Sequence, residues 1–275
     1  MKKLFIGKLL NHIFLVVVCI IILLPFFWIF ATSLRSPANS FSFPPSFFPT
    51  EFRWDNYVEV FRSIPFFQFL WNSLFVATVS TVGQCLLSAL AAYVFTRLEF
   101  RGKKFFFFLI LSGMMIPAQV TIVPLFLVIK TLNLMDTVFS LILPSLIYPL
   151  GIFLLRQYML TLPKSYDEAA FLDGAGYFRI FRTIMLPMSM PTLVVIGVMH
   201  FISVWNDFFK PLIFINTYEK MTLPLGMTIL KGFMGNGNLS VILAGVMISV
   251  IPPLIFYVIG QRKLIEGMAM VGIKG

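Results

Sequence analysis

The residues with the clearest chemical potential lie in one polar stretch, residues 165–174, which separates two long apolar segments. Ser165 and Glu168 have the Ser-x-x-Glu spacing of a capping box, in which the two side chains bond amides at the start of one helix. Asp167 and Glu168 would lie in the electropositive first turn of that helix. The pattern predicts a short helix that starts at Ser165 and offers a low-relief surface to another protein.

The rest of this loop, residues 162–187, fits the same reading. Gly174 and Gly176 allow a sharp turn, and residues 177–185 would form a second helical segment that runs to Pro187. A lone Glu-Ala-Ala would indicate only an ordinary solvated helix start. Here Gly174 and the Ile-x-Leu-Pro motif at residues 184–187 follow at fixed spacing, which favours a docking loop. The expected docking residues are Ser165, Asp167, Glu168, Ala169, Ala170, Gly174, Ile184, Leu186 and Pro187.

Catalytic chemistry finds little support in the chain. The sequence contains no Gly-x-x-x-x-Gly-Lys-Ser/Thr phosphate loop, no Gly-x-Ser-x-Gly nucleophile elbow and no His-Glu-x-x-His. Cys19 and Cys85 both lie in apolar segments, where packing is their usual role. His12 and His200 add no ligand cluster. We therefore expect no catalytic residues, no metal and no cofactor.

The composition requires a membrane. Of the 275 residues, 59% are hydrophobic and 12% are charged, whereas soluble domains average about 25% charged. A helix needs about 20 apolar residues to cross a bilayer. We predict an all-α integral membrane protein, a single transmembrane domain over residues 1–275, with six spans near residues 12–33, 69–95, 105–130, 137–158, 191–211 and 240–261.

The basic residues predict the orientation. Most Lys and Arg residues fall before the first span, in residues 96–104, in residues 156–190 and after residue 261, whereas acidic residues divide about evenly. By the positive-inside rule, both termini and the 162–187 loop face the cytoplasm. The first apolar run is too long for a typical signal peptide. The net charge of +10 comes from short clusters beside span ends, which favours membrane anchoring over nucleic acid.

Other features suggest packing and a substrate path. Small residues recur along the second span at helical spacing, which favours close helix packing; they are Ala77, Thr81, Cys85, Ser88 and Ala92. A short helix is expected near residues 56–62. Hydroxyl-matching and aromatic groups suit a neutral sugar, and the candidate pathway residues are Gln119, Tyr148, Trp205, Asn206 and Asp207.

The 162–187 loop resembles the cytoplasmic coupling loop, or EAA loop, of ATP-binding-cassette (ABC) importer permeases. Over most of its length the chain resembles the shorter, maltose-permease-type subunit of carbohydrate importers. The local patterns that carry the resemblance are Asn72-Ser73, Ala91-Ala92-Tyr93 with Arg97, Ile116-Pro117 with Pro124-Leu125, Trp205-Asn206-Asp207-Phe208 with Pro211-Leu212, and the tail from Gln261 to Gly275.

This resemblance implies a sugar permease in a bacterial or archaeal inner membrane. Its partners would be a second permease, a cytoplasmic ATPase dimer and an extracytoplasmic sugar-binding protein, and Lys274 and Gly275 would contact the ATPase. A polyol or glycerol phosphate is an alternative substrate. An ion-coupled secondary transporter is the alternative class, but it would usually need mid-membrane charges and internal repeats. A non-transporting scaffold would leave the loop motif without a purpose.

Overall fold

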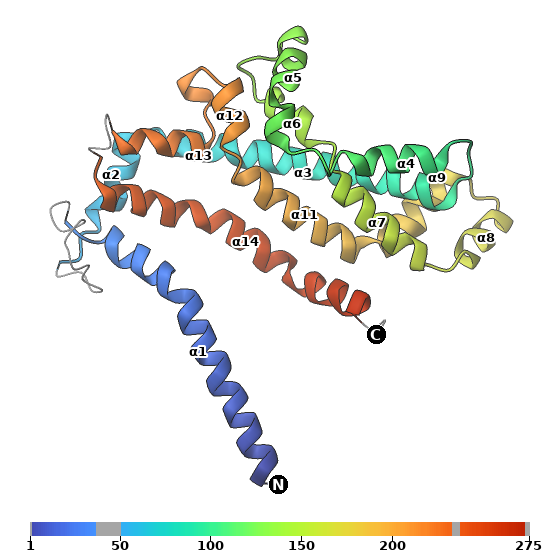
Figure 1. Cartoon of the computed structure of the whole chain (residues 1–275), viewed down its shortest axis with the longest axis horizontal. Helices are drawn as coiled ribbons and strands as arrows, with labels where there is room; N and C mark the ends of the chain where they lie inside the picture. Colours follow the sequence, from blue (N-terminus) through green and yellow to red (C-terminus); the bar gives the residue numbers. More distant parts are fainter. Residues whose placement is uncertain (1, 37–50, 233–236, 273–275) are drawn as a thin grey trace. The chain divides into compact units, whose positions relative to one another are not determined.

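The structure is a computed structural model that describes residues 2–36, 51–232 and 237–272 (Figure 1). Within these ranges every regular element is helical and none is a strand. The prediction of an all-α protein is therefore confirmed. The chain divides into two compact units, Met1–Phe67 with Gly226–Ile251 and Gln68–Leu225 with Pro252–Gly275.

The described residues contain a series of α-helices. They are α1 (Lys2–Ser33), α2 (Asp55–Ser63), α3 (Phe66–Arg97), α4 (Lys103–Ser112), α5 (Ala118–Thr131), α6 (Phe139–Ser145), α7 (Pro149–Thr161), α8 (Ser165–Leu172), α9 (Tyr177–Ile180), α10 (Leu186–Met188), α11 (Met190–Trp205), α12 (Phe209–Phe214), α13 (Leu223–Gly226) and α14 (Leu239–Gly272). A π-helical turn, η2 (Phe181–Met185), and two 3₁₀ segments, η3 (Tyr218–Lys220) and η4 (Met227–Lys231), complete the set.

In the first unit, α2 holds the end of α1. The last carbonyl groups of a helix have no partner within the helix. Asn56 Nδ2 donates to the carbonyl oxygens of Ser33 and Arg35, both at 2.8 Å. The Ser33 hydroxyl also bonds the Tyr57 hydroxyl at 2.8 Å. The short helix that the sequence predicts near residues 56–62 is therefore present, and it caps its neighbour.

Several described helices are long and apolar enough to span a membrane. Four stretches qualify, at Leu10–Ser33, Phe66–Arg97, Phe139–Thr161 and Leu239–Gln261, and the third of these comprises α6 and α7. A fifth candidate is the pair Tyr177–Met188 and Met190–Trp205, which is bent by 74°. These positions agree with four of the six predicted spans, and α14 continues through Pro252 and Pro253 without a break.

The other two predicted spans differ from the structure in their helix boundaries. Residues 105–130 form two helices, α4 and α5, because the chain is interrupted between Gly113 and Pro117. Pro117 has an extended backbone, with ψ of 134°, and its ring offers no amide to a helix. Residues 191–211 are interrupted after Trp205, where α11 ends. Six spans thus remain a prediction.

The second unit is built around α3. The small residues of its predicted stripe are buried or half-buried, and Ala77 and Ala92 are fully enclosed. One core cluster comprises Ala89, Ala92, Tyr93, Leu155, Met159, Ile180, Phe181, Met185, Leu193 and Ile196. A second comprises Val76, Ile129, Leu141, Ile142, Phe214 and Ile215. The first cluster joins α3, α7 and α11 to the segment that follows α8, so it supports the predicted docking loop.

A hydrogen-bonded clamp at Asp136 joins two connections of the second unit. Its carboxylate accepts the amides of Asn216 at 2.9 Å and Thr217 at 2.8 Å. The Thr217 hydroxyl and Lys220 Nζ also donate to it. Asp136 itself has a φ of 57°, an unusual value for a residue other than glycine. The bonds from Thr217 hold the pKa of the Asp136 carboxyl well below its ordinary value.

We expect Asp136→Asn to loosen this clamp, because an amide nitrogen cannot accept the bonds from Thr217 and Lys220. Because the pKa of Asp136 is lowered on folding, its ionised carboxylate stabilises the folded protein at any pH above the ordinary pKa of 3.8. That stabilisation is lost as the pH falls through the lower pKa of the folded state. Hydrogen exchange of residues 132–138 and 214–220 should be faster in the variant at pH 7. Equal exchange in the two proteins would show that the clamp is unnecessary.

Candidate coupling site

The predicted docking helix is α8, and it begins at Ser165 as expected. The predicted capping box is wrong. Lys164 is the N-cap residue, its carbonyl accepts the amides of Asp167 and Glu168, and no side chain caps the helix. Because the first helical bond starts one residue earlier, Ser165 lies inside the first turn and its hydroxyl is out of position for a cap.

Gly174 ends α8 in a left-handed conformation, with φ of +76°. The amide of Gly174 donates to the Phe171 carbonyl, and the amide of Ala175 donates to the Ala170 carbonyl. This pair of bonds is a Schellman motif, which requires a left-handed residue that is usually glycine. Gly176 is extended instead, with φ of −78°. Of the two glycines in the predicted turn, only Gly174 needs its type for the backbone.

The second helical segment starts at Tyr177 as predicted. It continues from α9 through the π-helical turn η2 into α10, which contains Leu186 and Pro187. Ile184 and Leu186 are half-buried, and both pack against the first core cluster. Single π-turns occur often at functional sites. These residues therefore attach the loop to the helical core.

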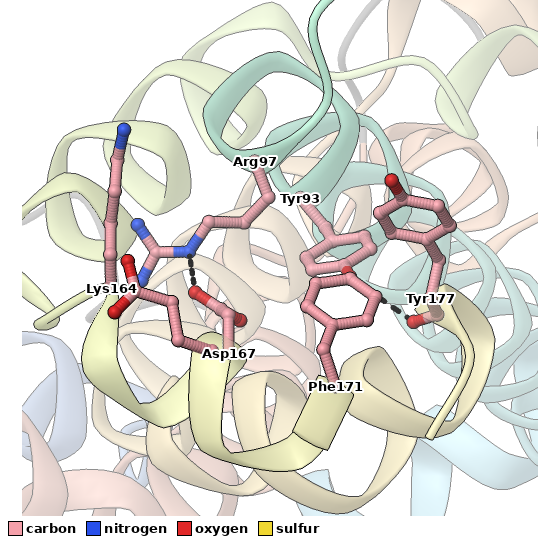
Figure 2. Close-up of a pocket in the computed structure, with 7 residues that line it drawn as sticks. Tyr93, Arg97, Lys164, Asp167, Phe171 and Tyr177 are labelled. Atoms are coloured by element: carbon pink, nitrogen blue, oxygen red, sulfur yellow. Dashed lines mark hydrogen bonds and ion pairs between the residues drawn. The ribbon is translucent and has the colours of Figure 1, made fainter. Parts of the chain in front are cut away.

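A buried ion pair fixes α8 to the end of α3. Arg97 Nε lies 2.6 Å from Asp167 Oδ2, and the two side chains are only 6% and 10% exposed (Figure 2). Arg97 Nη2 also donates to the Leu162 carbonyl at 2.9 Å and approaches Met185 Sδ at 3.8 Å. Burial raises the pKa of the Asp167 carboxyl, and the Arg97 guanidinium opposes that shift. One arginine thus contacts the loop before, within and after α8.

The position of Asp167 corrects part of the sequence prediction. Its carboxylate faces inward, whereas Glu168 and Ala169 are exposed and Ala170 is half-buried. Asp167 therefore holds the helix in place and does not contribute to its outer surface. Sequence reasoning missed Arg97 as its partner. The available signal was that Arg97 and Asp167 carry opposite charges and lie on the same predicted side of the membrane.

A pocket of about 160 Å³ opens beside the ion pair. It is lined by Tyr93, Arg97, Lys164, Asp167, Glu168, Phe171 and Tyr177 (Figure 2). The Tyr93 hydroxyl donates to the Tyr177 carbonyl at 3.1 Å, and the ring of Phe171 meets that of Tyr177 edge-on with centroids 5.1 Å apart. These contacts join α3 to the start of α9, and the start of α9 to the last turn of α8. The described residues include no cluster of His, Cys, Asp or Glu that could hold a metal ion.

Large apolar side chains on the loop face outward. Leu172 is 90% exposed and Phe178 is 70% exposed, with Tyr166 at 48%. We call this surface the apolar ridge; it comprises Tyr166, Ala169, Leu172 and Phe178. A loop that exposes large apolar side chains while a buried ion pair holds it in place is suited to binding another protein. The site can therefore dock a partner, and the Arg97–Asp167 pair anchors it.

The candidate pathway residues are only partly brought together. Tyr148 lies edge-on to His200, with ring centroids 5.1 Å apart, and Asp207 pairs with Lys210 at 2.8 Å. Lys210 Nζ reaches the Ser145 hydroxyl at 3.2 Å. No motif marks His200 or Lys210, so sequence reasoning assigned neither of them a role in the path.

Other predicted positions lie apart from this group. Trp205 is buried and stacks on Phe201. Gln119 and Asn206 are exposed, and the contacts found in the described residues do not join them to Tyr148 or Asp207. Lys274 and Gly275, the predicted tail contacts, lie outside the described residues.

Comparisons with known proteins agree with this geometry. Residues 84–264 match the family model described as the binding-protein-dependent transport system inner membrane component. The chain is 34% identical over 230 residues to the arabinooligosaccharides transport system permease protein AraQ of Halalkalibacterium halodurans, covering 83% of this chain and 82% of the relative.

Two solved structures share the fold. A bacterial ABC transporter involved in the import of the acidic polysaccharide alginate gives a TM-score of 0.81 at 25% identity, covering 96% of this chain and 98% of the other. A bacterial alginate ABC transporter in complex with an alginate pentasaccharide-bound periplasmic protein gives 0.67 at 15% identity, with 95% of each chain covered. The family match spans the loop, its ion pair and the helices that hold them, so this chain belongs to the binding-protein-dependent transport system inner membrane components, the permease subunits of ABC transporters.

Proposed function

We propose that this chain is the permease subunit of an ATP-driven sugar importer and that α8 is its coupling helix. It forms the translocation path with a second permease, receives sugar from an extracytoplasmic binding protein, and is driven by a separate ATPase dimer. The observation that carries the coupling role is the apolar ridge on a loop that the buried Arg97–Asp167 pair holds to α3. The family and the names of the relatives support a sugar as substrate.

The contacts suggest how movement passes from the ATPase to the membrane. Closure of an ATP-bound dimer would push on the apolar ridge, and α8 is too well anchored to yield alone. Arg97 ties it to α3, and Ile184 and Leu186 tie the following segment to the core cluster that contains α7 and α11. Displacement of the loop therefore moves packed helices as a group, which is how domain motions open and close a substrate cavity.

The orientation and the path are further parts of the proposal. The basic residues favour cytoplasmic termini and a cytoplasmic α8, in a multi-pass inner membrane protein. The terminal Lys274 and Gly275 would contact the ATPase. The sugar would pass Tyr148, Trp205 and the polar group at Asp207, since aromatic faces and hydroxyl-matching groups suit a sugar; Gln119 and Asn206 complete the proposed set.

Copurification tests the coupling role. We expect the wild-type chain, expressed with its native neighbours and extracted in mild detergent, to bring down an ATPase and a second permease. Glu168→Lys reverses an exposed charge in the first turn of α8, where a cation is also unfavourable near the helix N-terminus. The variant should keep the second permease and lose most of the ATPase by quantitative mass spectrometry.

The matched control is Glu99→Lys, because Glu99 is an exposed carboxylate just after α3 that pairs with the half-buried Lys103 at 2.9 Å. It should retain the ATPase. Full recovery of the ATPase with Glu168→Lys would count against docking on α8. Recovery of this chain alone from the wild type would count against the whole assembly.

A further inference from the structure

The helix is broken between α6 and α7, within the residues of the predicted fourth span. In a continuous helix the amide of residue 149 would donate to the carbonyl of Ser145, but Pro149 has no amide hydrogen. Tyr148, immediately before it, is extended, with φ of −128° and ψ of 90°. A carbonyl left without a donor in the membrane is costly, so the Ser145 carbonyl needs a partner from elsewhere.

His200 supplies that partner from α11. Its Nε2 lies 2.8 Å from the Ser145 carbonyl oxygen, and its side chain is buried. Because a carbonyl can only accept, Nε2 carries the hydrogen, and Nδ1 accepts from the Thr81 hydroxyl at 3.1 Å. The two contacts fix the imidazole in one tautomer and one orientation. His200 therefore replaces the helical hydrogen bond that Pro149 removes.

The same imidazole supports the ring of Tyr148, which meets it edge-on. Gly151 leaves room for that ring, because a side-chain carbon there would lie 2.8 Å from Tyr148 Cδ1 and 2.5 Å from Gln84 Nε2. On the other side of the break, Lys210 donates to the Ser145 hydroxyl. The break is thus a built feature, in which the ring of Tyr148 contacts His200 and fits against the backbone at Gly151.

We infer that His200 is a positioning residue for transport: it stabilises the backbone break between α6 and α7 and so orients Tyr148 to contact the sugar. The inference rests on the proposed function, since it gives Tyr148 its place in the path. An aromatic ring in a fixed orientation can pack against the apolar face of a sugar. His200 itself need not touch the sugar, because its two ring nitrogens are both engaged by the protein.

Hydrogen exchange of residues 139–155 in the complete complex, reconstituted in nanodiscs, tests the support of the break without any sugar. In His200→Gln the side-chain amide is long enough to donate to the Ser145 carbonyl from the place of the imidazole Nε2. In His200→Asn the side chain is too short to do so. We expect Asn to speed exchange at the break by about tenfold, as for a buried acceptor left unpartnered, and Gln to exchange like the wild type. Equal exchange in Asn and wild type would overturn the inference.

A second-site variant separates this role from general packing. Pro149→Ala restores the amide that can bond Ser145, so it should return exchange in His200→Asn to the slow wild-type rate. Transport by the double variant should nevertheless remain about tenfold below that of the wild type. A continuous helix would remove the extended backbone at Tyr148 that orients its ring. Slow exchange with normal transport in the double variant would show that the break does not position a transport residue.

Transport is measured as uptake of radiolabelled arabinotriose into proteoliposomes that contain the binding protein and ATP, a probe chosen from the substrate named for the AraQ relative. Should the wild type not take up this probe, binding-protein-stimulated ATPase activity replaces uptake as the readout, and the variants keep the same expected order. Lack of stimulation in the wild type would instead contradict the importer proposal, while the exchange data still decide whether His200 supports the break.

Discussion

Arg97→Met should lower the free energy of unfolding of the purified complex by about 3–5 kcal/mol, because it leaves the buried Asp167 carboxylate without its partner. The same variant removes the donor to the Leu162 carbonyl, so α8 loses its attachment on two sides. Binding-protein-stimulated ATPase activity and uptake should fall together. Thermal unfolding of the reconstituted complex and uptake by proteoliposomes provide the two measurements.

Two further variants show whether the buried charge is the cause. Arg97→Met combined with Asp167→Leu removes both charges, and an apolar pair of similar volume is often as stable as the ion pair it replaces. Stability should therefore largely return. Lys103→Met is the control, because it breaks a solvent-accessible ion pair in which Lys103 Nζ lies 2.9 Å from Glu99 Oε1. It should leave the unfolding temperature unchanged. If Arg97→Met unfolds at the wild-type temperature, the ion pair does not secure the loop.

Substitutions at Gly174 should impair coupling in the order Asn, Asp, Val, with Val the most severe. A side chain here meets open space, so the cost comes from the backbone φ of +76° alone. An ordinary L-residue in this region costs roughly 1–2 kcal/mol, and Asn and Asp tolerate it best. Relief of that strain would unwind the last turn of α8 and displace the exposed Leu172. Uptake and ATPase copurification should decline in the same order.

Gly176→Ala is the matched control, because Gly176 is also surrounded by open space but has a φ that any residue adopts. It should transport normally. Loss of function at Gly176 with normal function in Gly174→Val would reverse the assignment and place the required flexibility at the second glycine.

The coupling loop shows which features a sequence can reveal. The polar stretch that begins at Ser165 marks the start of α8, although the capping box expected there is absent. Its end follows from Gly174, since a left-handed residue closes the helix. The capping box failed because Lys164 can serve as N-cap through its backbone alone. The Arg97–Asp167 pair joins residues 70 positions apart, and no local pattern specifies such a contact.

The membrane spans show a similar division. Hydropathy locates apolar segments, but it does not report whether a segment is one helix, because a proline interrupts hydrogen bonding without lowering apolarity. Pro117 therefore divides the predicted third span, whereas Pro124 and Pro252 lie inside helices that continue. The role of His200 could not be predicted either, since it depends on a hydrogen bond to the Ser145 carbonyl, which only the fold brings within reach.

The contacts of Arg97 also define what can be exchanged between permeases. A chimaera that receives residues 162–187 from this chain acquires Asp167 and the Leu162 carbonyl, but not the arginine that both need. The unit that must be transferred is therefore the loop together with the last turn of α3. These two segments are distant in sequence and adjacent in space. Engineering a permease to accept a foreign ATPase requires both segments to be moved as one unit.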